Sequence, residues 1–266
     1  MPKRYVTPGM ACGMALALLA GCGGGGLPEG VVGETRVNDG SAGYRYDPSG
    51  PSLETYRLTN GNIGIVGVPL SVAGLPDGFD AFARDDGPNP TTILLLAART
   101  PTDGGQYGSE LVASGSNVFE LLRLENTLLP TADAGEVTYV GVYAGQYARL
   151  EPGDIFGDLG HMFGDARIFV DFEDGSVSGE ITGRANSGSP PELAADVMLL
   201  TTQLVNGRFS GDATGGAFSG GTSAGGTYDG LIVGDVGQEI VAGVQIDHSI
   251  GTVDYFEIGG IIASSD

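Results

Sequence analysis

RIFVDFEDGSVSGEI, residues 167–181, contains two alternating runs joined by a turn. In the first run Ile168, Val170 and Phe172 share one face, and Arg167 and Asp171 lie on the other. Asp174-Gly175 then supplies a pair suited to the positive φ angles of a tight turn. The second run returns with small or apolar residues at every other position. A period of two indicates strands with one buried face, so this stretch predicts a β-hairpin.

The same alternation continues from Gly135 to Asp266. We expect eight strands there, at 137–148, 167–172, 177–181, 197–204, 208–213, 227–233, 238–247 and 253–263. Eight meandering strands usually close into a barrel whose interior is filled by side chains or holds one small ligand. The predicted fold class is therefore all-β: an eight-stranded antiparallel up-and-down barrel over residues 135–266, preceded by a small β-rich, handle-like region.

Residues 44–134 form this predicted handle-like region. The run Ile93–Ala98 is short and fully apolar, which indicates a buried strand. The run Val118–Asn126 contains leucines that would share a broad helical face. However, Gly115 and Pro130 bound it tightly and its neighbours are β-like, so we expect a strand there.

The N-terminus has the pattern of a lipoprotein signal peptide, residues 1–21. Lys3 and Arg4 precede the apolar run Met10–Ala20, which is too short to cross about 30 Å of hydrocarbon as a helix. The run ends in Leu19-Ala20-Gly21-Cys22, which matches the bacterial lipoprotein box; an ordinary signal peptide with a coincidental cysteine is the alternative. The sequence predicts cleavage before Cys22, then diacylglycerol and palmitate-type acylation that anchors the chain permanently.

The residues around Cys22 also predict a location. The residue after Cys22 is Gly23 and not Asp. By the enterobacterial sorting rule, this predicts delivery to the outer membrane of a Gram-negative bacterium. Residues 22–43 would then be a lipidated flexible tether. Because polar residues such as Arg167 and Glu180 lie on the predicted outer faces, and an anchor would be redundant on an embedded barrel, we expect a soluble, tethered barrel. Whether it faces the cell surface or the periplasm stays open.

The charge balance excludes one class of partner. Formal net charge is −21, from 33 acidic and 12 basic residues. Such a field repels phosphate backbones, so no nucleic-acid binding is expected. It favours a cationic partner patch, although acidity also keeps a surface protein soluble. Cys12 would be lost with the leader, so no disulfide is expected.

No residue pattern indicates catalysis or a metal site. The segment 221–225 matches the Gly-x-Ser-x-Gly nucleophile pattern but leads into a strand, so we interpret it as a flexible hairpin loop. His161 and His248, with Asp165 and Asp247 nearby, could in principle hold a metal. They lack ligand-like spacing, and we interpret them as solvated loop histidines. We therefore expect no enzyme activity, no metal and no cofactor.

Two groups of tyrosines could serve binding. Tyr139, Tyr143 and Tyr147 share one face of the first barrel strand, where they could line a small-molecule pocket or fill the barrel end. We favour packing. A second group in the handle-like region could form an exposed aromatic patch of the kind found at protein interfaces; its members are Tyr44, Tyr46, Tyr56 and Tyr107.

Five segments together resemble a known family. They are Ile168–Phe172, Val177–Ile181, Asn206–Gly211, Gly226–Gly230 and Gly237–Gly243. With the lipoprotein box they look like the C-terminal barrel of transferrin-binding-protein-B-like bacterial surface lipoproteins. The resemblance implies a filled barrel preceded by a β-rich handle, displayed from the outer membrane. It also implies that iron-loaded host proteins or related ligands are presented to a TonB-dependent transporter. This chain has one lobe instead of two and lacks recognisable ligand-contacting cap loops, so fold, anchoring and a generic binding role carry over.

The predicted function is therefore a ligand- or protein-binding module anchored to the outer membrane, in iron, haem or solute capture beside a TonB-dependent transporter. Its ligand-binding residues stay unknown, but the loops 151–165, 184–196 and 214–226 are the expected contact surface, because loops on a rigid barrel often carry recognition. The alternative is a structural or adhesin-like envelope lipoprotein without a soluble ligand. A hydrolase would need a nucleophile–base pair, and none stands out.

Overall fold

The structure is a computed structural model that describes residues 30–38, 42–49, 52–57, 63–85, 92–112, 117–150, 158–218 and 220–265. Regular structure in these ranges is β, apart from the 3-10 helix η1 (Ala132–Ala134). Within the same ranges, no helical segment has the length and apolar character needed for a membrane crossing. The predicted leader, Cys22 and the beginning of the predicted tether lie outside the described residues.

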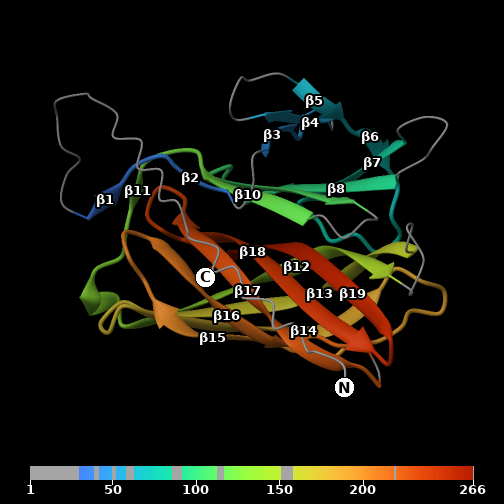
Figure 1. Cartoon of the computed structure of the whole chain (residues 1–266). Helices are drawn as coiled ribbons and strands as arrows, with labels where there is room; N and C mark the ends of the chain where they lie inside the picture. Colours follow the sequence, from blue (N-terminus) through green and yellow to red (C-terminus); the bar gives the residue numbers. More distant parts are fainter. Residues whose placement is uncertain are drawn as a thin grey trace, which may run out of the picture.

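Eight strands of the C-terminal half close into a barrel, in which each strand pairs with its sequence neighbours and the last pairs with the first (Figure 1). They are β12 (Glu136–Leu150), β13 (Asp158–Asp171), β14 (Ser176–Asn186), β15 (Val197–Gln203), β16 (Arg208–Gly215), β17 (Thr222–Val233), β18 (Glu239–Ile250) and β19 (Val253–Ser264). The all-antiparallel up-and-down barrel is confirmed. Gly175 (φ 65°) and Gly207 (φ 68°) take the positive φ that their predicted turns require.

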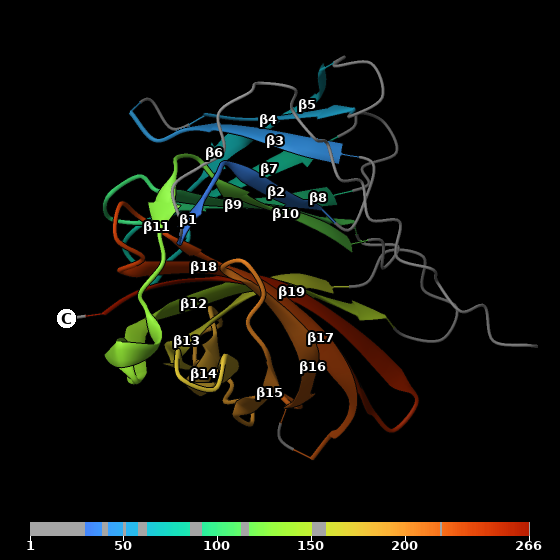
Figure 2. The ribbon, with the colours of Figure 1, turned by 90° about the vertical axis from the view of Figure 1, so that its left-hand side faces the viewer.

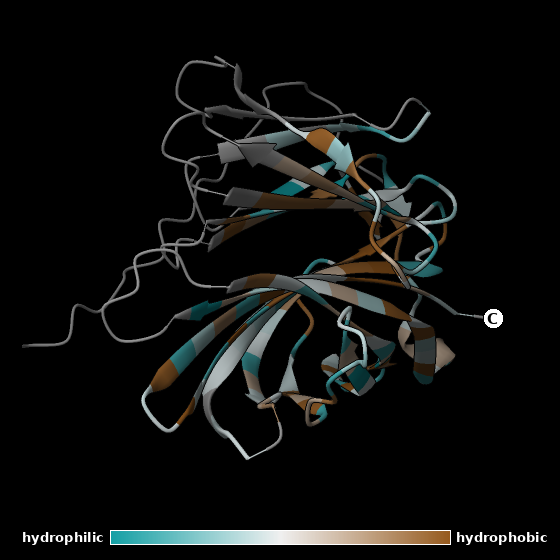
Figure 3. Ribbon diagram, turned by 90° about the vertical axis from the view of Figure 1, so that its right-hand side faces the viewer, coloured by the Kyte–Doolittle hydropathy of each residue, from teal (hydrophilic) through white to brown (hydrophobic). Residues whose placement is uncertain are grey.

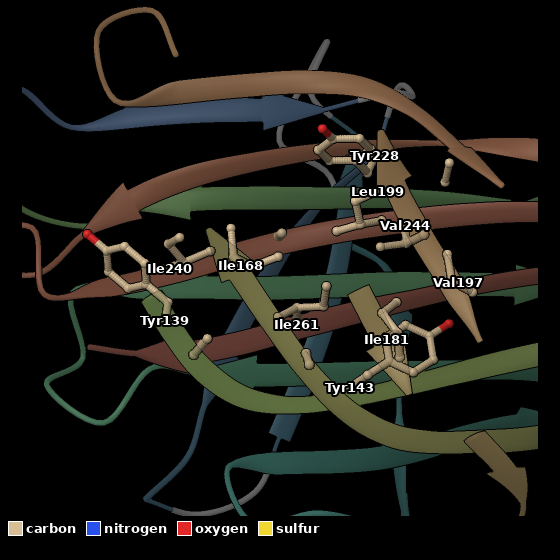
Figure 4. Close-up of a cluster of buried hydrophobic side chains, with 14 of the residues drawn as sticks. Tyr139, Tyr143, Ile168, Ile181, Val197, Leu199, Tyr228, Ile240, Val244 and Ile261 are labelled. Atoms are coloured by element: carbon tan, nitrogen blue, oxygen red, sulfur yellow. The ribbon is translucent and has the colours of Figure 1, made fainter. Parts of the chain in front are cut away.

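Side chains fill the interior of the barrel (Figure 4). Ile168 and Ile181 point inward from neighbouring strands and have no exposed surface. Tyr139 and Tyr143 are equally buried, and the Tyr139 hydroxyl donates a hydrogen bond of 2.6 Å to the Gly237 carbonyl. Tyr147 packs against the same core and is partly buried. The packing interpretation of this tyrosine stripe is confirmed.

The N-terminal half builds a six-stranded sheet above the barrel, in the order β2-β10-β9-β8-β7-β6. Its strands are β2 (Thr35–Asn38), β6 (Val68–Leu70), β7 (Phe79–Asp85), β8 (Thr92–Arg99), β9 (Gly105–Val112) and β10 (Asn117–Arg123). The strand expected near Val118 is confirmed as β10, and the apolar run Ile93–Ala98 forms most of β8.

Two smaller sheets complete the fold. One contains β3 (Ala42–Asp47), β4 (Ser52–Arg57) and β5 (Ile63–Val66), and the other pairs β1 (Val31–Val32) with β11 (Thr127–Leu128). The expectation that residues 22–43 are a flexible tether is therefore wrong for residues 31–38. There, β1 and β2 pair with strands that lie far along the chain, and these hydrogen bonds fix the segment.

The six-stranded sheet packs on the outer surface of the barrel, as Figure 2 shows in side view. Outward-facing Leu231, Val241 and Ile258 from the barrel are fully buried against Tyr107 and Phe119 of the sheet. The interface is the second apolar core of the molecule. The expected polar outer face is therefore wrong for this side of the barrel. On the uncovered side, charged residues such as Arg167 and Glu180 occur together with exposed apolar ones such as Met198 and Leu200 of β15, and the ribbon there mixes hydrophilic and hydrophobic residues (Figure 3).

Glycines let aromatic rings of the sheet sit directly on the barrel backbone. A Cβ atom at Gly260 would lie 2.6 Å from Cδ1 of Tyr107, and one at Gly243 would lie 2.6 Å from Cδ2 of Phe119. Gly259 serves the inner face in the same way, because a Cβ there would lie 2.4 Å from the Tyr143 ring. Consecutive glycines in β19 thus admit one ring on each side of the barrel wall.

The tyrosines of the handle-like region lie inside these layers. Tyr44 and Tyr46 are 2% and 5% exposed, and Tyr107 has no exposed surface. Tyr44 donates through its backbone N–H to the buried Glu120 carboxylate at 2.9 Å. The expected exposed aromatic patch is therefore wrong for these three residues. Tyr44 and Tyr46 are buried in the core that the small sheet shares with the six-stranded sheet, and Tyr107 is buried between the six-stranded sheet and the barrel. The Tyr56 side chain lies outside the described residues.

Candidate functional site: a groove between loop and barrel

A groove of about 490 Å³ lies where the connection from β6 to β7 meets the outer surface of β13 and β14. Its lining comes from four stretches of chain. The residues are Ala73, Gly74, Pro76, Val142, Phe163, Gly164, Asp165, Gly183, Ala185, Asn186, Ser187, Gly188 and Pro191. The volume falls within the range of small-ligand sites, and the groove is open along the surface. We refer to it as the seam groove.

The loop side of the seam groove is held in place by turns and packing. The Leu75 N–H donates to the Val72 carbonyl at 3.3 Å, and the Phe79 N–H donates to the Pro76 carbonyl at 3.2 Å. Both Val72 and Leu75 pack against the core between sheet and barrel. Gly74 adopts φ 78°, and a Cβ there would lie 3.7 Å from the Phe163 ring. The loop therefore presents a preformed wall.

The barrel side of the groove is shaped by a β-bulge. The register between β13 and β14 shifts between Phe163 and Asp165, and Gly183 opposite adopts φ 62°. The extra residue on β14 reverses which side chains point outward. As a result Arg184 turns into the barrel interior, and Ala185 lines the groove.

The end of β14 closes the groove through hydrogen bonds of Asn186. Its side-chain oxygen accepts from the Gly188 N–H at 3.1 Å and from the Glu192 N–H at 2.8 Å. The Ser187 N–H donates to the His161 carbonyl at 3.0 Å. These contacts hold the segment after β14 against β13, so this wall is also preformed.

The walls are mainly apolar, with one charged group. Val142, Phe163 and Pro76 supply apolar surface, and Asp165 supplies a carboxylate. Asp165 is exposed, and its side chain makes no hydrogen bond or ion pair with any residue that the structure describes. No basic side chain belongs to the lining. The groove can therefore hold an apolar group next to a neutral or positively charged one.

The predicted contact loops contribute unequally to the groove. The segment 151–165 supplies Phe163, Gly164 and Asp165, but these lie in β13, which begins at Asp158; 151–157 lie outside the described residues. The segment 184–196 supplies Ala185–Gly188 and Pro191, with its first residues still in β14. The segment 214–226 supplies nothing. Sequence reasoning missed Ala73–Pro76, although the nearby glycines and prolines indicate a connection there.

A buried polar network lies inside the barrel behind this wall. Arg184 of β14 and Glu257 of β19 form an ion pair with no exposed side-chain surface. The Tyr143 hydroxyl also donates to Glu257, at 2.6 Å. Arg184 donates further to the carbonyls of Ala195 and Gly216, both at 2.7 Å. Because β14 and β19 are not neighbours, the pair crosses the barrel and ties two connecting loops to its wall.

Burial sets the ionisation of this network. Desolvation, followed by the nearby Glu257 carboxylate, raises the pKa of Tyr143 well above its usual value of 10.0. Burial acts to lower the pKa of Arg184, but Glu257 beside it raises that pKa above its usual value. The tyrosine stays neutral and the arginine stays charged at physiological pH. The network holds the barrel end together and exposes no reactive group.

Both histidines are buried, so the interpretation as solvated loop residues is wrong. His161 lies in β13 and is 5% exposed; burial lowers its pKa to about 4. His248 lies in β18, is 2% exposed, and stacks on Tyr255 with 5.0 Å between ring centroids. Burial lowers the pKa of His248 as well. Longer strands than expected place both residues in the ladder. Across the described ranges, no three His, Cys, Asp or Glu residues gather as a metal site would require.

The Gly-x-Ser-x-Gly segment is part of a strand. Thr222–Gly225 opens β17, and Gly225 pairs with Asp247 of β18. The interpretation as a hairpin loop is therefore wrong, but the strand continues to Val233 without the helix that a nucleophile elbow requires.

Comparisons with known proteins find likeness in structure only. No protein-family model matches the chain, and no curated protein matches it. A transferrin-binding protein B double mutant from Haemophilus parasuis is 14% identical over 84% of this chain and 50% of that one, with a TM-score of 0.40. Isotype 1 transferrin-binding protein B from serogroup B Neisseria meningitidis is 16% identical over 78% of this chain and 36% of that one, with a TM-score of 0.39.

This chain therefore spans half or less of those two structures. Likeness at such TM-scores carries no argument about family or function. The barrel assignment rests on the strand pairing of the chain itself.

Proposed function

We propose that this chain is a binding module of the bacterial envelope, anchored by lipid on Cys22 and contacting its partner through the seam groove. The observation that carries the proposal is the groove itself: about 490 Å³, open to the surface, with both walls fixed by hydrogen bonds. A preformed site loses little conformational freedom on binding, which favours affinity. In the outer membrane of a Gram-negative bacterium, such a module would work beside a TonB-dependent transporter in solute, haem or iron capture.

Two further features support a tethered module. The lipoprotein box at Leu19–Cys22 supports an attachment that would precede β1 in the chain. The side of the barrel that the sheet leaves uncovered carries ion pairs, such as Arg208–Asp229 at 2.9 Å and Arg167–Glu180 at 3.6 Å. Charged pairs of this kind suit a surface in water.

Filling the groove tests where the partner binds. Ala73 lines the groove and is exposed, so Ala73→Trp should occupy it without disturbing a core. Ala134→Trp, on the exposed η1, is the matched control. In a crosslinking pull-down from intact cells, we expect the wild type and Ala134→Trp to retain the same partner and Ala73→Trp to lose it. Equal recovery by all three, or by none, would refute the seam groove as the contact site.

Removing the lipid acceptor tests the anchor. Cys22→Ser should release the protein from the membrane fraction, because the acyl chains supply about 0.8 kcal/mol per buried methylene. The measurement is fractionation of cells followed by detection of the protein. Continued membrane association of Cys22→Ser would contradict lipid anchoring at this residue.

A further inference from the structure

We infer that the seam groove receives an arginine side chain of a partner protein, with its guanidinium on Asp165 and its alkyl stem along the apolar walls. The inference rests on the binding role proposed above and names the chemistry of the partner. Three observations carry it: the engagement of this chain's own cations, the free carboxylate in the groove, and the shape and polarity of the walls.

The first observation concerns the cations of the chain. Lys3, in the predicted leader, is the only lysine in the sequence, so arginines supply the other basic side chains. Every arginine whose side chain is described already has an interaction within the chain. The ion pairs are Arg36–Glu120, Arg99–Asp103, Arg167–Glu180, Arg184–Glu257 and Arg208–Asp229. In the part of the chain whose side chains the structure describes, the surface therefore offers a partner carboxylates rather than unpaired cations.

The second observation concerns the groove carboxylate. Asp165 lines the groove, and its carboxylate has no hydrogen-bond or ion-pair partner among the described residues. Asp77 and Glu192, both exposed, directly follow the lining residues Pro76 and Pro191 in the chain. With a formal net charge of −21 on the whole chain, the local field attracts a cation into the groove.

The third observation concerns the walls and favours arginine over a compact ammonium ion. Val142, Phe163 and Pro76 give apolar surface along which an alkyl stem can lie while its charged head reaches a carboxylate. A planar guanidinium can bond a carboxylate through two parallel N–H groups and can stack on an aromatic ring such as Phe163. An ammonium ion would keep more of its hydration and use less of this surface.

The open form of the groove favours a side chain presented by a protein over a free small molecule. Small-molecule sites usually enclose most of the ligand surface. The seam groove is instead open along the surface between a loop and two strands. A single side chain carried on a larger partner fits this shape, because contacts around the groove would add to those inside it.

The test is a titration of the ¹⁵N-labelled full chain, followed by NMR of the glycine amides that line the groove. The probes are N-acetyl-arginine-methylamide, its uncharged citrulline analogue, its lysine analogue and the free amine agmatine. The variants are Asp165→Asn, the charge-matched control Asp133→Asn on the exposed η1, and Ala73→Trp.

We expect the arginine probe to shift Gly164, Gly183 and Gly188 more strongly than the citrulline or lysine probe does. Asp165→Asn should weaken arginine binding about fivefold, the upper end for an exposed ion pair, and Asp133→Asn should leave it unchanged. Ala73→Trp should abolish the shifts for every probe.

The other outcomes separate the two proposals. If citrulline binds as well as arginine, or Asp165→Asn behaves like Asp133→Asn, the arginine inference is overturned while groove binding stands. If the lysine probe binds as tightly as the arginine probe, the proposed preference for a guanidinium over an ammonium group is overturned. If agmatine binds more tightly than the arginine probe, the occupant is a free amine, and the proposal that a partner protein presents the arginine is overturned. Absence of shifts with every probe would overturn the arginine inference, and the pull-down with Ala73→Trp would still decide the proposed function.

Discussion

At the scale of single residues, the buried pair Arg184–Glu257 links strands and loops at the barrel end. Both side chains are fully buried. Each charge is paired with the other and has at least one further hydrogen bond. A buried ion pair need not outperform an apolar pair of the same size. Removing one partner, however, leaves an uncompensated charge in the interior.

We predict that Arg184→Met lowers the free energy of unfolding by about 3–5 kcal/mol, because it leaves Glu257 buried and unpaired. Arg167→Met is the control, since the Arg167 side chain is 60% exposed and its pair with Glu180 is worth less than about 1 kcal/mol. Urea unfolding measures both. Adding Glu257→Gln to Arg184→Met should restore part of the loss. Similar losses for Arg184→Met and Arg167→Met would contradict the buried role.

His161 predicts a pH dependence of stability. Burial lowers its pKa from 6.5 to about 4 in the folded state, so the folded chain binds this proton less readily than the unfolded chain. Stability is therefore full above pH 6.5 and falls as the pH drops toward 4. At pH 5 the loss from this residue is about 2 kcal/mol.

The variant His161→Gln isolates this contribution. Urea unfolding at pH 7 and pH 5 should show a smaller decrease in the variant than in the wild type, by about 2 kcal/mol. His248 contributes in the same direction in both proteins, because burial lowers its pKa too. If the free energy of unfolding falls between pH 7 and pH 5 by the same amount in His161→Gln as in the wild type, titration of His161 does not cause the pH dependence.

At the scale of elements, β19 joins the two cores of the molecule. Gly259 admits the Tyr143 ring on the inside, and Gly260 admits the Tyr107 ring on the outside. Strand β18 is likewise buried on both faces along Glu239–Val244. These strands behave as central layers of a three-layer structure rather than as the wall of an isolated barrel.

We predict that Gly260→Ala destabilises the protein by about 1–3 kcal/mol, because the new methyl group would overlap the Tyr107 ring and force the sheet away from the barrel. Thr138→Ala, at an exposed position of β12, should change stability by less than about 0.5 kcal/mol. Thermal unfolding with a near-ultraviolet circular dichroism signal reports both. If Gly260→Ala leaves the thermal stability unchanged, the sheet–barrel interface can accommodate a methyl group at this position, contrary to the prediction.

At the scale of the whole molecule, the sheet and barrel share one apolar interface. Removing the sheet would expose Leu231, Val233, Val241, Ile258 and Ile262 together. A contiguous exposed apolar surface of this kind causes association or aggregation. The two halves are therefore expected to depend on each other, although each has its own hydrogen-bonded sheet.

We predict that residues 135–266 produced alone bind the dye ANS and self-associate, whereas the chain with its sheet does neither. Size-exclusion chromatography and dye fluorescence measure these properties. A control barrel fragment carrying Leu231→Ser, Val241→Ser and Ile258→Ser should associate less. A monomeric, dye-free fragment with native sequence would show that the barrel does not need its cover.

The barrel was predictable because its information is local. Alternation such as that of residues 167–181 decides strand and face, and turns such as Asn206-Gly207 decide antiparallel order, since side chains in a strand alternate with period two. The groove was not predictable in the same way. Its walls come from Ala73–Pro76 and from strands that lie about 90 residues further along the chain, and no local pattern brings them together.

The histidines and tyrosines show the same limit. His161 and Tyr107 belong to segments whose own patterns leave room for exposure, and layers formed by other parts of the chain bury them. Arg184 shows it most sharply, because a single extra residue in β14 turns it from the surface to the interior.

The sequence by itself determined that the chain is all-β, the approximate positions of the eight barrel strands, and that the charge is strongly acidic, because periodicity, turn residues and composition act within a few residues or over the whole chain. Only the tertiary structure decided which outer face is covered, which charges are paired, and that Asp165 stands free in the seam groove. These depend on contacts between segments far apart in sequence, where burial and steric fit, not local preference, set the outcome.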